Sequence, residues 1–83
     1  MNSFLSLDRL PKHEKAWVKA VRSLESQSGL ARQLEDIGFV PGEQVQILSK
    51  AMIGGDPMVV RVGQSTFALR QAEAQLIEVS SEP

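Results

Sequence analysis

The hydrophobic pattern first becomes regular at residues 15–24, where apolar and polar positions alternate. Ala16 and Val18 alternate with Trp17 and Lys19, which is the period of a β-strand. The alternation slips by one residue at Ala20–Val21, and such a slip indicates a β-bulge. A short apolar piece, residues 4–7, and a polar turn precede this strand.

The next segment has the 3.6-residue period of an amphipathic helix over about residues 28–37. Leu30, Leu34 and Ile37 form one narrow apolar stripe, and Ser28 suits the N-cap position. Gly38 stands where a left-handed residue ends many helices in a Schellman motif, and Phe39 follows where it packs back on Leu34.

Turn residues divide the remainder into short strands. Pro41 and Gly42 occupy the two central positions of a type II turn, and Gly63–Gln64 has glycine first, as in a type II′ hairpin. Strands are expected at 43–51, 57–62, 65–70 and 76–79, with a helical turn at about 71–75. The fold class is therefore mainly β: a small five-stranded antiparallel barrel with one short helix, forming a single domain over 1–79 with a polar tail at 80–83.

The stretch Gly54-Gly55-Asp56-Pro57 admits two interpretations. Glycine lets backbone N–H groups approach an anion closely, so a phosphate cradle is one of them. A phosphate loop, however, opens a helix, whereas this stretch leads into the apolar run 58–62 of a strand that begins at Pro57, and it lacks the lysine of a P-loop. We interpret it as a structural turn, like Gly38, Pro41, Gly42 and Gly63.

Charge and composition narrow the classes of function that fit the sequence. Nine basic residues stand against ten acidic ones, without a basic block, and this disfavours a nucleic-acid binder. There are no cysteines, so disulfides and thiolate metal sites are excluded. The N-terminus does not resemble a signal peptide and no apolar run is long enough to cross a membrane, which predicts a cytoplasmic protein without direct membrane insertion.

Residues suited to catalysis or metal binding are few. The single histidine, His13, lies in a polar turn beside Glu14, and we interpret it as a solvated side chain. The alternative is adventitious zinc capture by His13 and Glu14 together with a carboxylate of a second molecule. We expect no intrinsic metal site, no cofactor and no enzymatic activity.

A contact surface for a partner protein is the remaining candidate. Met52, Ile53 and Met58 surround the glycine turn, and methionine suits surfaces that repack against a partner. An ordinary core with scattered exposed apolar residues is the alternative. Leu24, between the first long strand and the helix, is a further candidate contact.

The ordered series of motifs resembles the ferrous iron transport protein A (FeoA) family. The motifs are the helix ending in a Leu-x-x-Ile-Gly step, the Pro-Gly corner, the Gly-Asp-Pro turn, the "ALR…EA" segment and the final "IEV" strand. The chain departs from the family at His13, where the family usually has glycine. It also has Gln33 directly before the helix leucine, where the family often has arginine, and its own Arg32 comes one residue earlier.

The resemblance implies an SH3-like barrel that is not an enzyme and acts in bacterial ferrous iron uptake. It implies as partner the FeoB membrane permease, which carries its own G-protein domain. A generic SH3-like interaction or oligomerisation module, unrelated to iron, is the second hypothesis. Because a small barrel leaves strand edges open, a homodimer is compatible with either hypothesis.

Overall fold

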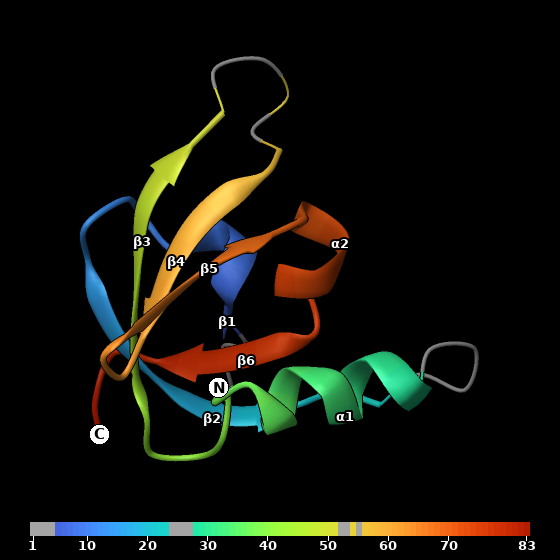
Figure 1. The fold of residues 1–83 in the computed structure, drawn as a ribbon. Coiled ribbons are helices and arrows are strands. Elements are labelled where there is room, and N and C mark those ends of the chain that lie inside the picture. Colours follow the sequence, from blue (N-terminus) through green and yellow to red (C-terminus); the bar gives the residue numbers. More distant parts are fainter. Residues whose placement is uncertain (1–4, 24–27, 52–53, 55) are drawn as a thin grey trace.

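The computed structural model describes residues 5–23, 28–51, 54 and 56–83 (Figure 1). Short strands joined by tight turns curl into a barrel, and one longer helix lies beside it. The elements are β1 (Leu5–Ser6), the 3₁₀ helix η1 (Leu7–Arg9), β2 (Lys15–Val21), α1 (Ser28–Asp36), β3 (Gln44–Lys50), β4 (Met58–Val62), β5 (Ser65–Leu69), α2 (Gln71–Ala74) and β6 (Ile77–Ser80).

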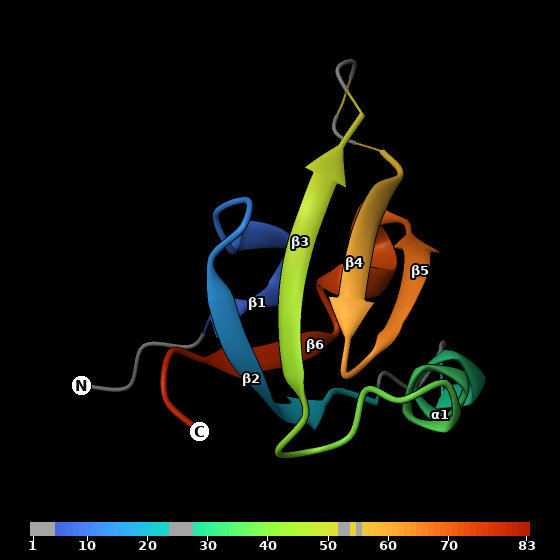
Figure 2. The same ribbon diagram turned by 60° about the vertical axis from the view of Figure 1, so that its left-hand side comes forward.

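The sheet has six antiparallel strands in the order β1-β6-β2-β3-β4-β5, so the prediction of five strands was wrong by one (Figure 2). The additional strand, β1, is only two residues long and pairs Leu5 with Val79 and Ser6 with Glu78. Two residues are too few to show an alternating pattern in a sequence. Strand β6 extends through Ser80, which we had predicted to begin the polar tail.

Two bulges bend the long strands. The register of β2 against β6 shifts between Val18 and Ala20, one position before the predicted slip. A second shift separates Ile47 from Ser49 in β3 against β4. Because a bulge increases local twist, the two together help curl the sheet into a barrel.

The core lies inside the barrel and follows the predicted alternation. The inward positions are Ala16 and Val18 in β2, Val45 and Ile47 in β3, Met58, Val60 and Val62 in β4, and Ile77 and Val79 in β6, all of them buried. Helix α1 adds Ala31 and Leu34, and the segment after it adds Phe39.

Helix α1 ends in a Schellman motif. The Phe39 N–H donates to the Leu34 carbonyl at 3.0 Å, and the Gly38 N–H donates to the Glu35 carbonyl at 3.1 Å. Gly38 has φ 127°, a conformation that side chains rarely adopt. These bonds satisfy carbonyls that the helix end would leave unpaired and turn the chain so that Phe39 enters the core.

The Pro-Gly corner then fixes the chain against β2. The Glu43 N–H donates to the Val40 carbonyl at 3.1 Å, and Gly42 has φ 95°, as the predicted type II turn requires. The Gly42 N–H also donates to the Val18 carbonyl at 2.9 Å, while the Val18 N–H donates to the Glu43 carbonyl at 2.8 Å. Backbone hydrogen bonds between Val18 and both Gly42 and Glu43 therefore fix the corner against β2.

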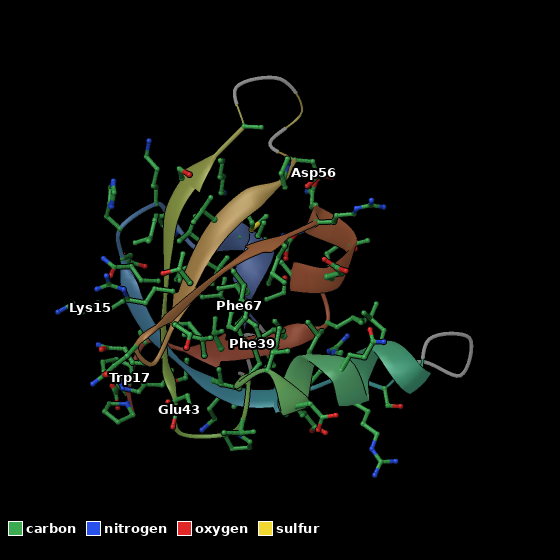
Figure 3. All side chains as sticks on the ribbon, viewed as in Figure 1. Lys15, Trp17, Phe39, Glu43, Asp56 and Phe67 are labelled. Carbon is green, nitrogen blue, oxygen red and sulfur yellow. The ribbon has the colours of Figure 1, made fainter. Side chains whose placement is uncertain are left out.

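The turn that contains Asp56 joins β3 to β4 and also contacts α2. Gly54 has φ 73°, and the Asp56–Pro57 peptide bond is cis. The Asp56 carboxylate accepts the Gln71 N–H at 2.7 Å, which caps the first turn of α2 (Figure 3). Gly55 lies outside the described residues.

Candidate partner-binding surface

The structure removes one residue from the predicted contact surface. Met58 is only 2% exposed and packs in the core of β4, so its prediction as a surface contact was wrong. It stands at the first inward position of β4, and a buried methionine there is ordinary core packing. The other three predicted contacts, Leu24, Met52 and Ile53, lie outside the described residues.

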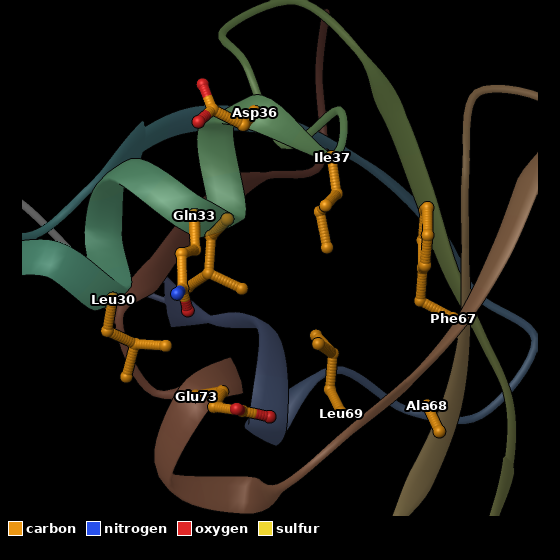
Figure 4. Close-up of a pocket in the computed structure, with 9 residues that line it drawn as sticks. Leu30, Gln33, Asp36, Ile37, Phe67, Ala68, Leu69 and Glu73 are labelled. Carbon is orange, nitrogen blue, oxygen red and sulfur yellow. The ribbon is translucent and has the colours of Figure 1, made fainter.

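The surface that the structure does show is an apolar groove between α1, β5 and α2 (Figure 4). Its volume is about 340 Å³, and its walls come from all three elements. The lining residues are Leu30, Gln33, Leu34, Asp36 and Ile37 on the helix side, Phe67, Ala68 and Leu69 on β5, and Glu73 on α2.

Part of this apolar lining remains open to solvent. Ile37 is 39% exposed, and Leu30 and Phe67 are half-buried at the margin of the core. The ring of Phe67 packs against that of the fully buried Phe39, with ring centroids 6.4 Å apart and ring planes inclined by 51°. The groove therefore has a rigid floor, because its base is part of the core.

The charged side chains of the groove are both acidic. Asp36 stands at the C-terminal end of α1, and Glu73 lies across the groove on α2 (Figure 4). The Glu73 carboxylate also accepts the Arg70 N–H at 2.7 Å, which holds it at the start of α2. The lining residues include no lysine or arginine, so the electrostatic character of the groove favours a basic partner.

Strand β5 forms one edge of the sheet, since among the residues that the structure describes it pairs with β4 alone. The turn Gly63–Gln64 sets its register by placing Val62 opposite Ser65. Gly63 has φ 58°, the sign that the first position of a type II′ turn requires. The residues that flank a two-residue loop form a hydrogen-bonded pair, so Val62 and Ser65 exchange their backbone bonds.

The alternation of hydrogen-bonded positions then determines which backbone groups of β5 face outward. Phe67 and Leu69 occupy bonded positions and direct their N–H and C=O groups toward β4. Thr66 and Ala68 occupy the non-hydrogen-bonded positions of β5 and direct their N–H and C=O groups away from the sheet. Within the described ranges, no hydrogen bond to the outward groups of these two residues is present.

His13 and Glu14 are both exposed in the turn before β2. His13 has φ 72° and is the only non-glycine residue with positive φ in the described part of the chain. Its N–H donates to the Ile47 carbonyl at 2.7 Å, and its carbonyl accepts the Gln46 side chain at 2.7 Å. Across residues 5–23, 28–51, 54 and 56–83, no cluster of three or more His, Asp or Glu side chains suits a metal ion.

These features define a class: a small SH3-like β-barrel with an open strand edge and an apolar groove. The family model for the FeoA domain matches residues 5–81, and the chain belongs to the FeoA family. The resemblance inferred from the sequence motifs is thereby confirmed, and the family is implicated in ferrous iron transport. No curated protein sequence matches the chain.

Solved structures of this family have the same fold. Stenotrophomonas maltophilia FeoA in complex with zinc, described as an SH3-domain protein and a candidate activating factor of ferrous iron transport, is 40% identical with a TM-score of 0.83. The match covers 93% of this chain and 91% of that one.

Iron(II) transport protein A from Clostridium thermocellum is 38% identical with a TM-score of 0.76, over 92% of this chain and 44% of that one.

A third relative, FeoA from Chlorobium tepidum, is 29% identical with a TM-score of 0.78, over 92% of this chain and 69% of that one.

Within the described residues, no helix is both long enough and apolar enough to cross a bilayer.

Proposed function

We propose that this chain is a small cytoplasmic accessory protein of bacterial ferrous iron uptake. In this proposal it binds the cytoplasmic part of a FeoB-type GTPase permease and regulates or assembles the transporter. The observation that carries the proposal is membership of the FeoA family over residues 5–81. The exposed apolar groove gives it a physical basis, because an exposed apolar patch with a polar rim is typical of a protein-binding surface.

The proposal assigns no catalytic step and no cofactor to this chain. Its contribution is a binding free energy that differs between states of the permease, since only such a difference can shift a conformational equilibrium. A near-neutral net charge of −1 offers little long-range steering, so apolar contacts supply most of that energy.

The direct test is calorimetric titration of this protein with the soluble cytoplasmic domain of the permease from the same organism. The titration is run without nucleotide, with GDP and with a non-hydrolysable GTP analogue. Binding in at least one state, together with loss of ferrous iron uptake on deletion of the gene, supports the proposal. If no state binds and uptake survives deletion, a generic SH3-like interaction or oligomerisation module replaces it.

Met52, Ile53 and Leu24 remain proposed contacts. We expect Ile53→Asp to weaken the association by about 2 kcal/mol, because it would bury a charge without a partner. Circular dichroism checks that the variant folds. An unchanged affinity would remove Ile53 from the interface.

We further propose that this chain has no intrinsic high-affinity iron site. Any bound zinc is expected at His13 and Glu14, shared with a carboxylate of a second molecule. Anaerobic equilibrium dialysis tests this: one tightly held ferrous ion per monomer, lost in His13→Ala, would contradict it.

A further inference from the structure

We propose that the groove beside β5 is the docking site for an extended segment of the partner, which adds to the sheet as a seventh strand. The inference rests on the proposed function for the identity of the partner, the cytoplasmic part of the permease. It goes beyond that function because it names the surface, the conformation of the bound segment and the residue pattern that the segment must have.

The first observation is the open edge of β5. Thr66 and Ala68 direct their N–H and C=O groups away from β4, and an added strand would pair with these groups. An edge strand with unpaired backbone groups is the element that β-strand addition uses. The pairing supplies affinity without depending on sequence.

The second observation is that the groove lies on the side of β5 to which Phe67 points (Figure 4). Residues opposite each other on paired strands point to the same face of the sheet. A segment residue opposite Phe67 would therefore enter the groove between Phe67, Leu30 and Ile37. The residue opposite Leu69 would point to the same side, so the segment needs two apolar residues separated by one other.

The third observation is the charge of the rim. Asp36 and Glu73 carry the charges among the lining residues, and both are acidic. The Glu73 carboxylate lies on the groove side, whereas that of Asp36 points away from the cavity (Figure 4). A lysine or arginine next to the apolar pair would therefore meet Glu73 at the groove margin. The predicted occupant is thus an extended segment with the pattern apolar–any–apolar and an adjacent basic residue.

The test measures binding of the same soluble permease domain to three pairs of variants, each pair with a matched control. Ile37→Asn removes an apolar groove contact, and Val40→Asn is its control, because Val40 is 37% exposed against 39% for Ile37 and does not line the groove. We expect Ile37→Asn to weaken binding roughly tenfold or more and Val40→Asn to leave it unchanged.

The second pair tests strand addition itself. Ala68→Pro removes one outward N–H that β4 does not use, so the sheet keeps its bonds, while Ala68→Ser retains the N–H. Only the proline variant is expected to weaken binding, again by about tenfold. Thermal denaturation followed by circular dichroism checks that both variants fold.

The third pair tests the rim. Asp36→Asn with Glu73→Gln removes both charges and keeps acceptors for the α2 cap, and Glu35→Gln is the control outside the groove. We expect a loss of roughly threefold to tenfold at low salt that disappears at high salt. Overlapping synthetic peptides from the permease domain then identify the bound segment by its effect on the amide resonances of Thr66 and Ala68.

The outcomes separate the inference from the proposed function. Absence of binding by the wild-type protein overturns both. If all three groove variants bind as well as the wild type, or if only Ile53→Asp weakens binding, the groove is not the docking site. The proposed function then still stands. If the chain forms a dimer that Ala68→Pro abolishes while permease binding is unaffected, the edge of β5 serves self-association instead.

Discussion

The apolar residues in and just after helix α1 are of one kind but lie at different depths. Ala31 and Leu34 are buried against the barrel, and Leu34 also forms part of the groove wall. Leu30 is half-buried and Ile37, one residue after the helix, is exposed, and both line the open part of the groove. The hydrophobic period identifies the apolar stripe of a helix, but the depth at which each residue of the stripe lies depends on what the sheet places opposite it.

The difference separates residues that maintain the fold from residues that remain available to a partner. A substitution of a buried residue is expected to change the free energy of unfolding. A substitution of an exposed groove residue is expected to change binding with little effect on stability.

The largest effect is expected for Phe39→Ala among the buried residues. Phe39 is fully buried and supports Phe67, so its removal leaves a cavity under the groove. We expect a loss of about 3–5 kcal/mol in the free energy of unfolding, measured by urea denaturation. A loss below about 1 kcal/mol would show that the groove floor is not part of the core.

Leu34→Ala and Leu30→Ala compare a buried and a half-buried residue of the same stripe, one helical turn apart. The expected loss of stability is about 2–4 kcal/mol for Leu34 and about 1 kcal/mol or less for Leu30. Equal losses in urea denaturation would contradict the division of this stripe into buried and partly exposed residues.

Gly54→Val tests whether stability can fall without any change in the groove. Gly54 has φ 73°, and a β-carbon there would meet no atom within 4 Å, so the cost is conformational strain alone. We expect a loss of about 1–3 kcal/mol. Nucleotide binding that is saturable in the wild type and abolished by this change, with thermal stability retained, would instead make the turn a ligand site.

The smallest effect is expected for His13→Gly, and it is a gain. His13 holds φ 72°, which glycine adopts without strain, and its two hydrogen bonds use backbone atoms that glycine keeps. Thermal denaturation should show stabilisation of up to about 1 kcal/mol, with permease binding unchanged. A loss of stability would mean that the imidazole itself stabilises the turn.

The sequence predicted most of the barrel because its signals are local. Gly38 and Phe39 indicate the helix ending, Pro41 and Gly42 the corner, and Gly63 the hairpin, and each depends on residues close in the chain. The family resemblance identified the fold as SH3-like, and the related structures confirm it.

The groove could not be predicted in the same way. Its walls come from α1, β5 and α2, and no sequence signal places Ile37 opposite Phe67. Met58 was wrongly predicted to be exposed because its position beside a glycine turn outweighed its alternation with Val60 and Val62. That alternation was the signal that could have placed it in the core.

The position of β6 has a consequence for how the protein is made. This strand follows every other strand in the sequence, yet it lies between β1 and β2 and pairs with both. The pairs β2–β3, β3–β4 and β4–β5 can form as soon as they leave the ribosome, but β1 and the other edge of β2 have no partner until β6 is synthesised. Contacts between residues so far apart in sequence slow folding, so the newly made chain carries exposed strand edges until β6 arrives.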